Sequence, residues 1–162
     1  MDCLMGIDLG STSLKAVAYD LAGNLIASGS RPTERFHPDP AHPDWTVWRP
    51  EQIWGGTAAA IAEAVAGLPA AAQLRGVAVT GMGMDGLPID QQGQWLYPLI
   101  NWLDPRTVPQ MQWWLDRIGA EKQFAIGGNP LWPINSALRI RWVAEHEPDI
   151  YRRTYKWLLI ED

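Results

Sequence analysis

Residues 6–20 read GIDLGSTSLKAVAYD, and the architecture expected for the rest of the chain starts from this stretch. The apolar run at 4–9 predicts a buried strand, and the alternation over 14–19 predicts a second strand. The glycine and hydroxyl residues at 10–13 predict a turn between them. A second turn and a further strand at 25–30 follow. The sequence therefore predicts an antiparallel meander of three strands.

The first turn carries the residue types that hold a triphosphate. Gly10, Ser11 and Thr12 allow close backbone approach and supply donors. Lys15 supplies positive charge, and Asp8 supplies a carboxylate for Mg²⁺. The spacing is not that of a Walker A loop. The alternative is a plain hairpin with a polar turn. The full pattern instead favours a hairpin that binds the triphosphate of ATP.

Composition limits the class of protein. A chain of 162 residues, 47% hydrophobic and 19% charged, is long and apolar enough for a globular domain. A net charge of −5 argues against nucleic acid as a partner. No basic amphipathic stretch or signal peptide indicates a membrane, and the single cysteine, Cys3, predicts a small buried side chain. We expect a cytoplasmic protein.

The rest of the chain alternates helices and strands. Pro50 is suited to begin a helix, and Gly67 to end it. Apolar spacing places Trp54 with Ile53 and Ile61 on the face of this helix expected to turn inward. Beyond it we expect strands at 74–80, 87–90 and 95–99, helices at 109–118, 120–126 and 135–146, and a final buried strand over Tyr155–Ile160. Because a core strand usually leads into another element, we expect residues 1–162 to be the N-terminal portion of a longer polypeptide.

The stretch 6–20 resembles the first phosphate motif of the actin/hexokinase/Hsp70 superfamily, and more narrowly that of the FGGY carbohydrate kinases. Residues 45–54 resemble the aromatic stretch before that family's first helix. Residues 101–107, NWLDPRT, resemble its W-x-D/C-x-R-T segment. Residues 138–151 and 157–162 resemble its later helix and strand. The resemblance covers the whole chain, but only the first part of the family's first domain.

The resemblance implies an α/β fold of the ribonuclease H-like (actin-like ATPase) type. The mixed sheet would contain the antiparallel three-strand meander, a parallel strand after the first helix and the final strand, with flanking helices. Residues 1–162 would be the N-terminal part of the first, sugar-binding domain. That fold would be incomplete, and the second, nucleotide-binding domain would be absent.

The function implied is ATP-dependent phosphorylation of a sugar or polyol. Asp8 would organise Mg²⁺, while Gly10, Ser11, Thr12 and Lys15 would face the β- and γ-phosphates of ATP. The family's catalytic base is an aspartate expected beyond residue 162. We therefore expect these residues alone to be an inactive part of a carbohydrate kinase.

On the sugar side, the resemblance points to Trp102 as a stacking residue, because an indole face suits the C–H face of a sugar. Asp104 and Arg106 would bond hydroxyls or each other. The alternatives are a core tryptophan at position 102, and a cap with a surface ion pair at the following helix for the other two.

The glycine-rich loop at residues 81–86, GMGMDG, differs from the family's pattern. Gly83 and Met84 stand where glycerol kinases have Arg-Glu and xylulose kinases have Met-His, so neither substrate is indicated. Met84 would still lie at the substrate, and we advance the hypothesis that Asp85 contacts substrate hydroxyls. The alternative is an aspartate that only shapes the turn.

Two other functions remain open. A non-catalytic binding or regulatory module, or a truncated product, could use the same fold. Independently of function, we expect a homodimer or other association through apolar surface that is exposed where the rest of the domain would pack. A small-acid kinase or an Hsp70-like ATPase is disfavoured by the segment around Trp102. The histidines lack metal-ligand spacing.

Overall fold

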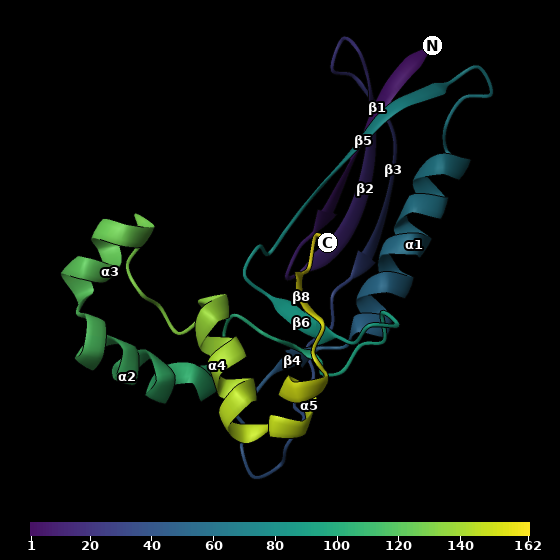
Figure 1. Ribbon diagram of the computed structural model, residues 1–162. Coiled ribbons are helices and arrows are strands. Elements are labelled where there is room, and N and C mark those ends of the chain that lie inside the picture. The colour runs from purple at the N-terminus through teal and green to yellow at the C-terminus, as the bar shows by residue number, and fades with distance from the viewer. The chain divides into compact units, whose positions relative to one another are not determined.

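The computed structural model describes residues 1–162, which form two compact units (Figure 1). The first unit contains Met1–Glu34, Arg49–Gly83 and Ile160–Asp162. The second contains Arg35–Trp48 and Met84–Leu159. The hairpin expected to hold phosphate belongs to the first unit, and the residues expected to contact the sugar belong to the second.

The first unit is built on a four-stranded sheet. Its strands are β1 (Asp2–Leu9), β2 (Ser13–Asp20), β3 (Leu25–Pro32) and β5 (Gln73–Gly81), in the order β3-β2-β1-β5. The first three pair antiparallel, and β5 pairs parallel with β1. The predicted meander and the predicted parallel strand are both confirmed.

Helix α1 (Pro50–Ala66) covers one face of this sheet (Figure 1). Alternation along β1 turns Met5, Ile7 and Leu9 toward the helix, where they are buried. Pro50 begins the helix, and the Gly67 N–H bonds the Glu63 carbonyl at its end. The predicted bounds of this helix are confirmed.

Small residues bring α1 very close to the sheet. A Cβ at Gly29 would lie 2.1 Å from the Ala60 carbonyl oxygen, so only glycine fits at this point of β3. Ala60 and Ala64 are the buried helix residues along this contact. Trp54, expected on the inward face, is instead 70% exposed, because the close approach leaves no room for its ring.

The second unit combines short strands with most of the helices. Strand β4 (Val47–Trp48) pairs with β7 (Leu99–Ile100), and β6 (Gly86–Ile89) pairs with β8 (Lys156–Leu159). The helices are η1 (Pro105–Thr107), α2 (Val108–Ile118), α3 (Ala120–Gly127), α4 (Ser136–His146) and α5 (Pro148–Arg153).

Aromatic side chains dominate the core of this unit. Ile100, Trp142 and Val143 form a buried cluster, with Trp45 and Tyr97 among the side chains packed against it. The helix predicted over 135–146 is therefore confirmed as α4. No helix of the structure is both long and apolar enough to span a membrane.

The final strand has a different partner from the one expected. We expected Tyr155–Ile160 to join the sheet of the meander, but β8 pairs antiparallel with β6, with Gly86 opposite Leu159. A Cβ at Gly86 would lie 2.4 Å from Trp157 Nε1, so this glycine permits the pairing. Hydrophobic periodicity indicates a strand, but it does not identify the partner.

Candidate active site

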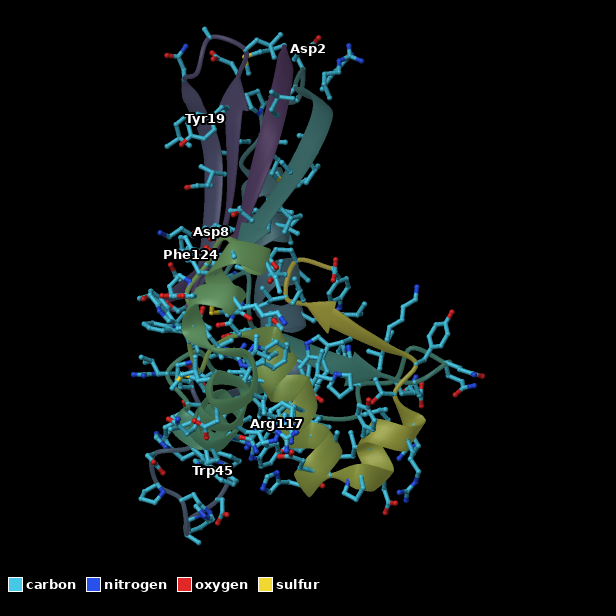
Figure 2. All side chains as sticks on the ribbon, turned by 60° about the vertical axis from the view of Figure 1, so that its left-hand side comes forward. Asp2, Asp8, Tyr19, Trp45, Arg117 and Phe124 are labelled. Carbon is cyan, nitrogen blue, oxygen red and sulfur yellow. The ribbon has the colours of Figure 1, made fainter.

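The ends of β1 and β2 bring Asp8 and Lys15 together. These two residues are Cα partners across the antiparallel pair, and Thr80 is the partner of Asp8 on β5. Ile7 and Leu9 point toward α1, so Asp8 and its two partners belong to the opposite face of the sheet. Lys15 is exposed and Asp8 is half-buried. Figure 2 shows Asp8 at the opposite end of β1 from Asp2.

Gly10 keeps the space beside this carboxylate open. A Cβ at this position would lie 2.8 Å from the Ser13 carbonyl oxygen and 3.5 Å from Asp8 Oδ2. Any larger residue would therefore distort the turn and crowd the carboxylate. Ser11 is half-buried and Thr12 is exposed, so a ligand can reach the turn. A turn with this shape and these groups fits a phosphate chain with its cation.

Thr33, just after β3, anchors the turn between β1 and β2. Its Oγ1 donates to the Gly10 carbonyl over 2.7 Å, and its N–H donates to the Thr12 carbonyl over 3.0 Å. Sequence reasoning missed this residue. Nothing in its neighbourhood signals the contact, because only the register of β2 and β3 places it there.

A residue near the C-terminus fixes the position of the loop after β5. The parallel register places Gly81 opposite Leu9, at the same edge of the sheet as the phosphate turn. The Glu161 carboxylate accepts the Gly83 N–H over 2.9 Å. Glu161 is a second residue that the sequence did not single out.

In the second unit, Asp85 lies at the centre of a buried polar cluster. Its Oδ2 accepts the Trp48 Nε1–H over 2.6 Å, and its Oδ1 lies 2.8 Å from Arg139 Nη1. The Arg139 contact is not aligned as a hydrogen bond, so Asp85 Oδ1 lacks a hydrogen-bond partner. Both side chains are withdrawn from solvent. Asp85 therefore does not offer its carboxylate at the surface, which argues against the hypothesis of direct contact with substrate hydroxyls.

Burial raises the pKa of Asp85, and the charge of Arg139 opposes that effect. The Trp48 indole, which donates to Oδ2, and the nearby Trp102 backbone also favour the carboxylate.

Met84 is fixed through its backbone. Its carbonyl accepts a hydrogen bond from Ser136 Oγ over 3.0 Å and another from the Arg139 guanidinium. The side chain is half-buried. Helix α4 therefore determines where this part of the loop lies.

Asp104 and Arg106 form a buried ion pair. Asp104 Oδ1 accepts the backbone N–H and Nε–H of Arg106, and Oδ2 accepts Arg106 Nη2 over 2.7 Å and the Thr46 N–H over 2.6 Å. Four hydrogen bonds use the acceptor capacity of this carboxylate. The cap and ion pair expected as the alternative are present, but the pair is buried rather than on the surface, and the cap serves η1.

Two tryptophans enclose the Arg106 guanidinium. It lies 4.3 Å from the centroid of the Trp45 ring and 5.0 Å from that of Trp142. Its Nη1 donates to the Tyr97 hydroxyl over 3.1 Å. Arg106 thus ties its segment to the aromatic core.

Trp102, which the sequence analysis assigned to the sugar, is accessible to solvent. Its side chain is 42% exposed, so it is not a core tryptophan. It lines a hollow of about 330 Å³ together with residues from η1, α2 and the segment before α4. Of the residues that the sequence assigned to the sugar, Trp102 and Asp104 line this hollow.

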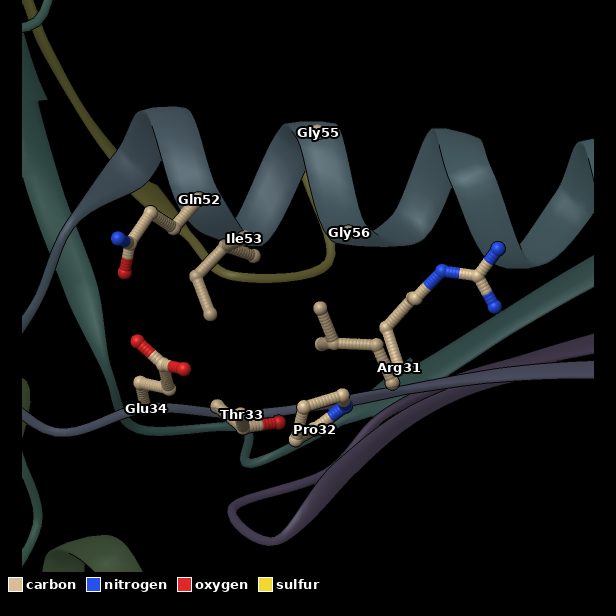
Figure 3. A pocket seen from close by; sticks show the side chains of 9 residues that line it. Arg31, Pro32, Thr33, Glu34, Gln52, Ile53, Gly55 and Gly56 are labelled. Carbon is tan, nitrogen blue, oxygen red and sulfur yellow. The ribbon is translucent and has the colours of Figure 1, made fainter.

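A second hollow, of about 370 Å³, lies in the first unit between the end of β3 and the first turns of α1 (Figure 3). Thr33 and Glu34 line one wall, and Gln52 and Ile53 line the other. Gly55 and Gly56 of α1 also line it. No residue predicted from the sequence to bind a ligand lines it. The structure also contains no group of three or more His, Cys, Asp or Glu that could hold a metal ion.

Curated relatives of the chain are sugar kinases. It is 30% identical to the L-fuculokinase of Escherichia coli K12 over 161 residues, which is 98% of this chain and 33% of the relative. It is 31% identical to a xylulose kinase of Klebsiella pneumoniae, covering 98% of this chain and 32% of the relative. The chain thus spans about a third of the length of these proteins.

Solved structures of sugar kinases have the same fold. The xylulose kinase of Rhodospirillum rubrum matches with a TM-score of 0.91 and 27% identity, over 99% of this chain and 32% of that chain. A xylulose kinase structure from Brucella ovis matches with a TM-score of 0.86 and 28% identity, over 99% of this chain and 33% of that chain. The predicted actin-like ATPase fold is confirmed.

The sequence model for the FGGY family of carbohydrate kinases, N-terminal domain, matches residues 3–162. This match covers nearly the whole chain. The protein therefore belongs to the FGGY family of carbohydrate kinases.

Proposed function

We propose that this chain is the part of an ATP-dependent kinase that binds phosphate and sugar, and that the kinase phosphorylates a hydroxyl of a sugar or polyol. The observation that carries the proposal is the pairing of Asp8 with Lys15 across a turn that requires glycine at position 10. A carboxylate, a cation and open backbone donors at one strand end are what a metal-bound triphosphate requires. Because the chain spans about a third of its relatives, the activity is proposed for the gene product that carries it.

On the phosphate side, the Asp8 carboxylate would hold Mg²⁺ and Lys15 would face the phosphates. The backbone N–H groups of Gly10, Ser11 and Thr12 would bind phosphate oxygens in the turn that Thr33 anchors. ATP with Mg²⁺ supplies the phosphoryl group. The residues of the hairpin position it and stabilise its negative charge, which is the main task in phosphoryl transfer.

On the sugar side, Trp102 would stack on the C–H face of the substrate, and Met84 would border it. Asp104 and Arg106 would act through the segment that they hold, since their charged groups already bond each other. Asp85 would act in the same way, through the Trp102 backbone. The base that deprotonates the sugar hydroxyl is expected from the family resemblance to lie beyond residue 162.

The test is sugar-dependent release of ADP by the gene product as it is made in the cell. The sugars are L-fuculose, D-xylulose and glycerol, after which relatives are named. Asp8→Asn should abolish the release. Asp2→Asn is the matched control, because Asp2 lies at the other end of β1 in a surface ion pair with Arg75 and should keep full activity (Figure 2).

The alternative is a non-catalytic binding module. It would bind a sugar or ATP without releasing ADP, and Asp8→Asn would change only nucleotide affinity. Transfer of phosphate to a sugar by the wild-type protein, lost in Asp8→Asn and retained in Asp2→Asn, excludes that alternative.

A further inference from the structure

The hollow beside Trp102 is apolar along most of its wall. Besides Trp102, it is lined by Leu103, Pro105, Val108, Trp132, Pro133 and Ile134, and Asp104 is its one charged residue. Building on the proposed function, we propose that the sugar substrate is a deoxy sugar, whose terminal methyl group lies in this hollow. A 6-deoxyketose has the required chemistry.

Several polar groups in the wall of the hollow already have hydrogen-bond partners within the chain. The Asp104 carboxylate accepts four hydrogen bonds. The Pro133 carbonyl accepts the Thr107 hydroxyl over 2.5 Å. The Trp132 N–H donates to Asn135 Oδ1 over 2.8 Å, and the Trp132 carbonyl accepts the Asn135 N–H over 3.0 Å. A sugar hydroxyl placed against these groups would lose water and gain little in return.

A methyl group has no such disadvantage. Moving it out of water and against Val108, Ile134 and the proline rings is favourable, because these side chains are apolar. Trp102 lines the same hollow, so one substrate can stack its C–H face on the indole and extend its methyl end along the wall. The hollow, at about 330 Å³, is of the size that small ligands occupy.

The experiment compares two ketoses that differ only at carbon 6. L-Fuculose ends in a methyl group, and L-tagatose has a hydroxymethyl group there with the same configuration elsewhere. The kcat/KM of the gene product should be about 10- to 100-fold higher for L-fuculose. L-Rhamnulose and L-fructose form a second pair of this kind, with a different configuration, and the same preference is expected for whichever pair is phosphorylated.

A variant tests whether the hollow is the source of the preference. Val108→Thr replaces one methyl group by a hydroxyl without changing shape, and should reduce the ratio between the deoxy and hydroxy sugars several-fold. Val65→Thr on α1 is the control, because Val65 is 48% exposed where Val108 is 42% exposed. It should leave the ratio unchanged. If Val108→Thr does not fold, Ile134→Thr tests the same wall.

The outcomes separate this inference from the proposed function. If D-xylulose or glycerol is phosphorylated and neither deoxy sugar is preferred over its hydroxylated partner, the deoxy-sugar inference is overturned and the kinase assignment stands. If no sugar stimulates ADP release, both are overturned. A deoxy preference that Val108→Thr reduces and Val65→Thr retains supports the inference.

Discussion

Asp85 and Arg139 form an ion pair in which 2.8 Å separates Oδ1 from Nη1 and both side chains are hidden from solvent. Asp85→Ala would leave a buried cation without its partner, so we expect the free energy of unfolding to fall by about 3–5 kcal/mol. Denaturant unfolding followed by tryptophan fluorescence measures this change. Asp149→Ala is the control, because Asp149 is 84% exposed in its pair with Arg152 and should have little effect. Equal effects of the two variants would contradict a structural role for the buried pair.

The pH dependence of stability should report the same carboxyl group. Burial raises the pKa of Asp85 above its ordinary value of 3.8. Between that value and the raised one, the folded protein binds more protons than the unfolded chain. The free energy of unfolding therefore loses a contribution as pH rises through this interval.

The measurement is the urea midpoint of the wild type minus that of Asp85→Asn, taken from pH 3 upward. This difference should be largest at the acid end, decrease as pH rises and become constant above the raised pKa. A difference that increases with pH would mean that Arg139 lowers the pKa of Asp85 more than burial raises it.

Two glycines of the first unit should respond to alanine in opposite directions. A Cβ at Gly29 would lie 2.1 Å from the Ala60 carbonyl oxygen, so Gly29→Ala must push α1 away from the sheet. We expect the free energy of unfolding to fall by about 1–3 kcal/mol. Gly55 lies inside α1 with nothing within 4 Å of an added Cβ, so Gly55→Ala should stabilise the helix by about 0.5–1 kcal/mol. Thermal unfolding of the two variants checks both signs. Destabilisation by Gly55→Ala would show that the helix needs glycine there for another reason.

Thr33 should affect nucleotide binding through the turn that it anchors. Thr33→Val keeps the shape but removes the hydroxyl that bonds the Gly10 carbonyl. We expect the affinity for Mg·ATP, measured by titration calorimetry, to fall about 2- to 10-fold. Thr33→Ser retains the hydroxyl and should bind nearly as well as the wild type. Equal affinities in the two variants would mean that this contact does not position the turn.

Much of the first unit could be predicted because its signals are local. Alternation along residues 4–19 gives two strands, and the glycine and hydroxyls between them give the turn. Pro50 and Gly67 give the ends of α1. The side of α1 that faces the sheet was less predictable. Apolar spacing favoured Trp54, but a helix that packs through Ala60 and Ala64 against Gly29 excludes a large ring.

The surroundings of Asp85, Asp104 and Arg106 could not be predicted from local sequence patterns. The proximity of Asp104 to Arg106 in sequence suggested their pairing, but its burial depends on Trp45 and Trp142, which come from distant segments. Asp85 has an ionic partner more than fifty positions away. The partner of β8 was missed for the same reason, since spacing within a strand carries no information about the strand beside it.

In the proposed kinase, Trp102 binds the sugar while the Asp8–Lys15 hairpin binds ATP. The KM values of Trp102→Ala for sugar and for ATP, measured in one kinase assay, separate these two roles. Trp95→Ala is the control, because Trp95 is 44% exposed, close to the 42% of Trp102. The sugar KM of Trp102→Ala should rise about 10-fold or more, with its ATP KM within about two-fold of wild type and both constants unchanged in Trp95→Ala. An unchanged sugar KM in Trp102→Ala, or an equal rise in its sugar and ATP constants, would contradict the claim.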